Sequence, residues 1–126
     1  MNMLLPAAGY ALGLALAAVA LAAGLAPELP FGRNLPATAI AVAVPAFVLA
    51  LIVLRLNGAR PFRLVQGIGL GVLTLFLGHF LFVALDGAGG NAPAKAMRLV
   101  TLGAPLTFPL FILAGLAFAA VMRRRA

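Results

Sequence analysis

The chain has 126 residues, of which 65% are hydrophobic and only 9% are charged. A soluble domain of this length leaves much of its surface exposed and cannot hide so many apolar side chains from water, so a soluble globular fold is excluded. There is no cysteine, and the net charge of +7 comes from basic residues that flank apolar segments, which indicates contact with anionic lipids of a bilayer rather than with nucleic acid.

Four apolar segments are long enough to cross a bilayer, whose hydrocarbon core of about 30 Å needs roughly 20 helical residues. They cover residues 4–26, 37–56, 64–85 and 97–122. Alanine and leucine dominate and β-branched alternation is absent, which favours helices over a transmembrane barrel. No basic residue precedes the first segment, so we expect it to be a retained span rather than a secretion signal. The connections are short, which predicts an all-α, up-down-up-down four-helix bundle forming a single transmembrane domain over residues 1–126.

Basic residues are distributed unequally between the two ends of this predicted bundle. The end with both termini and the second connection has six: Arg55, Arg60, Arg63, Arg123, Arg124 and Arg125. The other end has three, Arg33, Lys95 and Arg98, together with both acids, Glu28 and Asp86. The positive-inside rule then predicts cytoplasmic termini in a bacterial inner membrane.

Five of these arginines are candidates for binding lipid headgroups. They are Arg60, Arg63, Arg123, Arg124 and Arg125. A cluster of arginines next to a span binds anionic lipid, but it also serves as a simple topological anchor, and the sequence is compatible with both interpretations.

The two halves of the chain share features that suggest two similar helical hairpins. A pair of glycines four residues apart occurs in the first span, and the third span repeats it. The second and fourth spans each open on an asparagine followed two residues later by a proline, at Asn34 and Asn91. Such an asparagine cap and early proline make a sound helix start. Chance produces similar matches in a sequence rich in Ala, Leu and Gly, so duplication is one of two interpretations.

Small residues allow membrane helices to approach closely, because association in lipid depends on packing rather than on the hydrophobic effect. Six glycines are candidates for helix packing: Gly9, Gly13, Gly67, Gly71, Gly78 and Gly115. Their spacing is typical of contacts within one bundle, and also of contacts with another membrane protein or a second copy. Both interpretations make the third span central.

Prolines interrupt two of the predicted spans. Pro45 lies inside the second span, and Pro105 and Pro109 lie one turn apart in the fourth. Each proline removes a backbone donor and frees a carbonyl, which must face protein or water rather than lipid. We therefore expect a kink in the fourth span. The candidate polar site consists of His79, Thr101, Pro105 and Pro109. It is either a crevice for a substrate or a packing kink.

His79 is the single histidine and lies inside the third span. A neutral imidazole is cheaper to bury than an ammonium or a carboxylate, and we expect it to donate to a carbonyl freed in the fourth span. The alternative is a functional role, since an ionisable residue inside a membrane often marks a pathway or a binding site. One histidine without cysteine makes neither a zinc site nor a bis-histidine haem site, so we expect no metal and no cofactor.

Residues 67–77, with the sequence GIGLGVLTLFL, resemble the third helix of the small multidrug-resistance transporters, which are also short four-helix membrane proteins. That family needs a glutamate buried in its first helix. The corresponding stretch here, residues 10–24, contains no acidic residue, and the chain is therefore not assigned to the family.

Two functions for a small polytopic membrane protein follow from the sequence. The first is a non-catalytic accessory or structural subunit of a larger inner-membrane complex, because small-residue faces occur with little soluble mass and without a Ser-His-acid or phosphate-loop pattern. The second is a small oligomeric transporter or lipid flippase with a crevice near His79 and the proline-interrupted fourth span. A lesion-forming protein with a basic tail is a third alternative.

Overall fold

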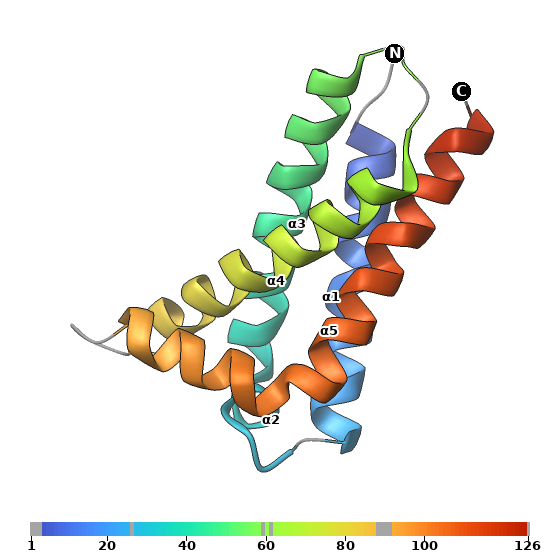
Figure 1. Cartoon of the computed structure of the whole chain (residues 1–126). Coiled ribbons are helices and arrows are strands. Elements are labelled where there is room, and N and C mark those ends of the chain that lie inside the picture. The colour runs from blue at the N-terminus through green and yellow to red at the C-terminus, as the bar shows by residue number, and fades with distance from the viewer. Residues whose placement is uncertain (1–3, 26, 59, 61, 88–91, 126) are drawn as a thin grey trace.

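The computed structural model describes residues 4–25, 27–58, 60, 62–87 and 92–125, and all of its elements there are helices (Figure 1). These are α1 (Leu4–Leu25), α2 (Pro30–Arg33), α3 (Leu35–Asn57), α4 (Leu64–Leu85) and α5 (Ala92–Arg125). The four longer helices, α1, α3, α4 and α5, are long and apolar enough to cross a membrane. The predicted all-α four-helix membrane fold is confirmed.

The four long helices alternate in direction and form two hairpins. α1 packs mainly against α3 and α4 mainly against α5, while contacts between α3 and α4 join the hairpins. The start of α1, the end of α5 and the connection between α3 and α4 lie at one end, at the top of Figure 1, and α2 lies at the other. This is the predicted up-down-up-down order. The helix α2 was not predicted, because four residues inside a polar connection show no periodic pattern.

α4 has its predicted bounds, whereas α3 and α5 begin before the apolar stretches that predicted them. α3 begins early because Asn34 caps it: its Oδ1 accepts the N–H of Ala37 at 3.3 Å, and Pro36 occupies the first turn. Asn34 also donates from Nδ2 to Oδ1 of Asp86 at 2.8 Å, so it connects the start of α3 to the end of α4. The matching prediction for Asn91 falls outside the described residues.

Glycines bring α4 and α5 to backbone contact. A Cβ atom at Gly67 would overlap the carbonyl of Gly115, and a Cβ atom at Gly71 would overlap the carbonyl of Phe111. Ala119 completes this contact, with its own Cβ 2.8 Å from the Cβ position of Gly67. The α4–α5 hairpin therefore tolerates no larger side chain at Gly67 or Gly71.

The carbonyl freed by Pro45 is covered by another helix. Pro45 lies inside α3, so the carbonyl of Ala41, four residues earlier, lacks its helical donor. Gly78 of α4 packs onto this oxygen, and a Cβ atom at Gly78 would lie only 3.1 Å from it. α4 is thus in contact with both neighbouring helices, and the largest fully buried side chains of the described residues all belong to it: Leu70, Thr74, Leu75 and Phe82.

α1 meets the bundle through alanines and leaves its glycines on the outside. The alanines on its buried face are Ala7, Ala11, Ala15, Ala18 and Ala22. Gly9 and Gly13 are exposed, and a Cβ atom at either position would meet nothing within 4 Å. The glycine pair of α1 therefore has the same spacing as the pair of α4, but no helix of this chain packs against its Cβ positions.

α5 changes direction sharply within its orange stretch in Figure 1. The bend follows the interruption of the helix by Pro105 and Pro109. The part of α5 before the bend runs beside the end of α4, and the part after it rises beside the start of α4 (Figure 1). The predicted kink is present, and it turns a single long helix into two differently oriented halves.

Candidate functional site

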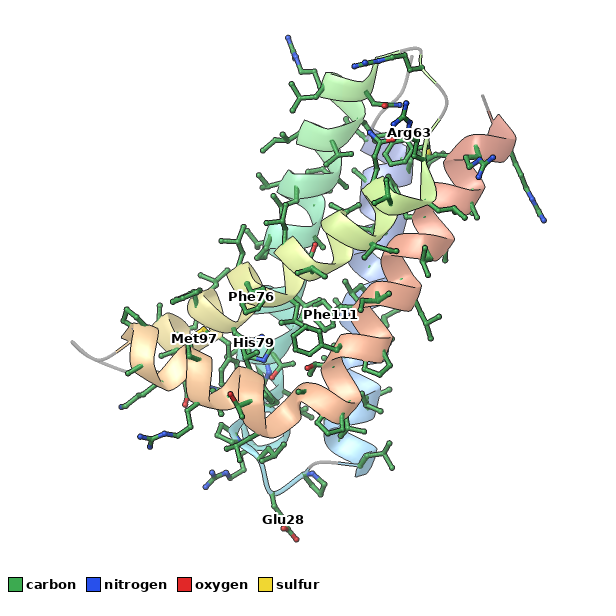
Figure 2. The ribbon with its side chains drawn as sticks, viewed as in Figure 1. Glu28, Arg63, Phe76, His79, Met97 and Phe111 are labelled. Carbon is green, nitrogen blue, oxygen red and sulfur yellow. The ribbon has the colours of Figure 1, made fainter. Side chains whose placement is uncertain are left out.

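A small cavity lies among the helices around His79. Its volume is about 50 Å³, and residues from every helix and from the α1–α2 connection line it. Most of the lining is apolar, and the polar side chains in it are Thr38, His79 and Thr107. In Figure 2, His79 lies below the middle of the molecule, and the ring of Phe111, which also lines the cavity, lies beside it.

His79 makes one hydrogen bond and leaves one ring nitrogen without a partner. The side chain is 4% exposed, and its Nδ1 lies 2.7 Å from the carbonyl oxygen of Leu75. A carbonyl only accepts, so Nδ1 carries the proton and Nε2 of the neutral ring presents a bare lone pair. Nε2 is buried and has no hydrogen-bond partner among the described residues. The ring of Phe31, on α2, lies edge-on at 5.1 Å from the imidazole.

The predicted partner of His79 was wrong. The sequence predicted a carbonyl freed in the fourth span, whereas the acceptor is Leu75 in the same helix. The carbonyl one turn earlier is within reach of a side chain of this length without any tertiary contact, as in the back-bonding of Ser and Thr in helices. The nitrogen left over, Nε2, is the one that needs a partner from elsewhere.

The hydroxyl groups of the two cavity threonines both donate to nearby backbone carbonyls. Thr107 Oγ1 donates to the carbonyl of Gly103 at 3.0 Å. Thr38 Oγ1 lies 2.8 Å from the carbonyl oxygen of Phe31 and 3.1 Å from that of Asn34, and donates to them. Both hydroxyl oxygens keep lone pairs, so the polar side chains of the cavity offer acceptors. Such a lining suits a small hydrogen-bond donor, and the volume is sufficient for a guest of about the size of water.

The other predicted members of the polar site lie elsewhere. Thr101, Pro105 and Pro109 are exposed on α5 and do not line the cavity. Thr101 donates to the carbonyl of Met97 at 3.0 Å within its own helix. The opposite face of the same segment, with Gly103 and Thr107, is the one that lines the cavity. The sequence signal for Thr107 was its place between the two prolines.

A second buried polar contact, between α1 and α4, was missed from the sequence. The hydroxyl of Thr74 donates to the carbonyl of Leu70 at 2.7 Å, so the hydroxyl of Tyr10 is the donor across the 3.0 Å that separates it from Thr74 Oγ1. Tyr10 is 7% exposed and Thr74 is fully buried. The only sequence signal was a hydroxyl inside each apolar span.

Three of the five candidate headgroup arginines share a pocket at the opposite end from Glu28 (Figure 2). The pocket has a volume of about 650 Å³, and Arg60, Arg63 and Arg123 line it. Arg124 is exposed and lies outside this lining, and the side chain of Arg125 is not among those described.

An apolar groove of about 370 Å³ runs between α1 and the second half of α5. Small residues make up part of its lining: Gly9, Gly13, Ala114 and Ala117. Larger side chains, Tyr10, Phe118 and Met122, contribute the rest together with Pro6, Leu14 and Val121. The predicted packing glycines are therefore divided. Gly67, Gly71 and Gly115 bring α4 and α5 together, and Gly78 packs against α3, whereas Gly9 and Gly13 face an open groove.

Comparison with known proteins adds no relative to this picture. No protein-family model matches the chain, and neither a curated protein nor a solved structure does.

Proposed function

We propose that this small membrane protein is a non-catalytic accessory or structural subunit of a larger inner-membrane complex. In this proposal, a transmembrane helix of a partner protein occupies the groove between α1 and α5. The observation that supports it is the glycine pair of α1, Gly9 and Gly13, where an added Cβ atom would meet no other helix within 4 Å.

The chain itself illustrates how such a pair functions. On α4, two glycines four residues apart let the backbone of α5 approach to contact distance. Helices in lipid gain stability from this kind of close packing, since lipid tails are as apolar as leucine. α1 carries the same glycine spacing beside small residues of α5. The groove therefore allows a helix of a partner protein to approach equally closely.

The experiment replaces Gly13 with leucine. A Cβ atom at Gly13 would meet nothing within 4 Å, so we expect Gly13→Leu to leave the fold intact while its side chain enters the groove. Gly69→Leu is the matched control, because Gly69 is also exposed and open but lies on α4, away from the groove. A photo-crosslinker at Ala117, in the groove, identifies the partner helix in the native membrane.

We expect a crosslinked partner with wild type and with Gly69→Leu, and at least a tenfold loss of that partner with Gly13→Leu, measured by quantitative mass spectrometry. Equal recovery from both variants contradicts the proposal. Recovery of nothing but a second copy of this chain also contradicts it, because the groove is then a self-association surface.

A second candidate function is transport of a small solute through the His79 cavity, and the unpartnered Nε2 supports it. A volume of about 50 Å³ favours a small hydrogen-bond donor over a lipid within this alternative. Methylammonium uptake into proteoliposomes is a suitable probe. We expect His79→Phe and Thr107→Val each to reduce uptake severalfold, and Thr101→Val, an exposed threonine of the same helix, to leave it unchanged. Unchanged uptake in both cavity variants removes this candidate.

A further inference from the structure

The pocket at the arginine-rich end is built from three separate parts of the chain. Asn57 at the end of α3, the connection with Arg60, and the first turn of α4 form one side, and Arg123 near the end of α5 forms the other. Phe62, which also lines the pocket, is 3% exposed and packs edge-on against Phe118 of α5 at 5.6 Å. This ring contact holds the connection against the helix that carries Arg123.

A network of hydrogen bonds fixes the floor of this pocket. Asn57 donates from Nδ2 to the carbonyl of Arg60 at 2.7 Å and accepts at Oδ1 from Nε2 of Gln66 at 3.1 Å. Gln66 in turn accepts the backbone N–H of Arg63 at 2.8 Å. The guanidinium of Arg60 donates to the carbonyls of Asn57 and Leu56, at 3.3 and 3.2 Å. These hydrogen bonds tie the end of α3, Arg60 and the first turn of α4 to one another without any ligand.

The charges around the pocket are uncompensated. The guanidinium groups of Arg63 and Arg123 make no hydrogen bond or ion pair with the described residues, and no acidic residue lines the pocket. The chain has two acids, and both belong to the opposite end; Figure 2 shows Glu28 there, far from Arg63. A guanidinium group can donate two parallel N–H hydrogen bonds to two oxygens of one phosphate group. The ammonium group of a lysine acts as a point charge and lacks this geometry.

The first turn of α4 adds to the positive electrostatic potential that the arginines create in the pocket. Leu64, Val65 and Gln66 line the pocket, and this turn contains no acidic residue. The N–H of Gln66 donates to the carbonyl of Arg63 at 3.1 Å. The first N–H groups of a helix otherwise have no partner within it, and the macrodipole makes this end partly positive. The turn supports the arginines, whose guanidinium groups come from both sides of the pocket.

We propose that this pocket binds one phosphate group, held by Arg63 and Arg123 with Arg60 as the fixed third charge. The pocket lies at the ends of membrane-spanning helices, where lipid headgroups are found, so the phosphodiester of an anionic lipid and a soluble phosphate are the two sources of this chemistry. The site is distinct from both the groove and the His79 cavity, and it does not depend on the proposed subunit role.

The test measures lipid binding to the full chain in detergent by native mass spectrometry, with phosphatidylglycerol against phosphatidylcholine as the probes. The variants are Arg63→Gln and Arg123→Gln, and each has a lysine counterpart that keeps the charge but loses the fork. Arg55→Gln is the matched control, because Arg55 is exposed in the last turn of α3 at the same end but does not line the pocket. A second arm adds inorganic phosphate as a competitor.

We expect one phosphatidylglycerol to bind in preference to phosphatidylcholine. Each glutamine variant weakens this binding by about fivefold, the effect of one arginine near a lipid surface, while Arg55→Gln changes it less than twofold. Each lysine variant falls between wild type and its glutamine counterpart. Displacement by millimolar phosphate assigns the site to a soluble phosphate, and resistance to it assigns the site to lipid. Equal loss in Arg55→Gln, or no preference for the anionic lipid with no binding of phosphate, overturns the proposal.

Discussion

At the scale of single residues, the polar side chains inside the spans differ in how fully they are satisfied. Tyr10 and Thr74 satisfy each other across the α1–α4 contact, and the chain of donors ends at a backbone carbonyl. His79 has a partner on one side of its ring and none of the described residues on the other. The first arrangement stabilises the bundle, and the second leaves an acceptor for a guest.

The Tyr10–Thr74 hydrogen bond makes a quantitative prediction. Tyr10→Phe removes one interhelical bond and leaves the threonine bonded to Leu70, so we expect the free energy of unfolding to fall by about 0.5–1.5 kcal/mol, the range for such bonds in membranes. Unfolding in mixed micelles, followed by circular dichroism, measures the change. Combining it with Thr74→Val in a double-mutant cycle should show a coupling of similar size. Fully additive losses would mean that the bond contributes nothing.

The sequence identified His79 as the polar centre of the third span, but not the cavity around it. Hydropathy marks an isolated imidazole clearly, since any polar group stands out in such a segment. Its surroundings depend on Phe31 of the unpredicted α2 and on the face of α5 that carries Thr107. The pairing of Tyr10 with Thr74 joins residues 64 apart in the chain, and no local pattern reports that contact.

At the scale of helices, the α4–α5 contact depends on the absence of side chains. Gly71→Ala places a methyl group against the backbone of Phe111, so the helices must separate, and we expect a loss of about 1–3 kcal/mol in the free energy of unfolding. Gly69→Ala, two residues away and open to the outside, should change it by less than about 0.5 kcal/mol. Steric-trap unfolding in bicelles compares the two. Equal stability of both variants would refute this account of the interface.

The spans could be predicted because the bilayer requires long apolar helices whatever their packing. Which face of each helix packs against a neighbour could not be predicted. α1 and α4 carry the same glycine spacing, but only the pair of α4 packs against another helix of this chain. The spacing of the glycines shows that another helix can approach closely, and the arrangement of the neighbouring helices decides whether one does. The same limit applies to α5, where the prolines predicted the kink but not that their own side would face outward.

At the scale of the whole molecule, the charges at the two ends predict the orientation. Because the arginine-rich end holds the end of α5 and the α3–α4 connection, we expect Arg60→Cys to react with a membrane-impermeant maleimide only after the cytoplasm is opened. Glu28→Cys, at the other end, should react in intact cells. The natural chain has no cysteine, so each variant gives one signal. The reverse pattern would invert the proposed orientation.

The bend in α5 also decides how deep its last turns sit. As a straight rod, its 34 residues would measure about 51 Å, far more than a hydrocarbon core of about 30 Å. Because of the bend near Pro105, the first part of α5 runs obliquely across the bundle, and the helix ends at about the same level as Arg63 (Figure 1 and Figure 2). Straightening the bend would move Arg123 away from Arg60 and Arg63. A substitution at Pro105, inside the membrane, would therefore change the pocket at the membrane surface.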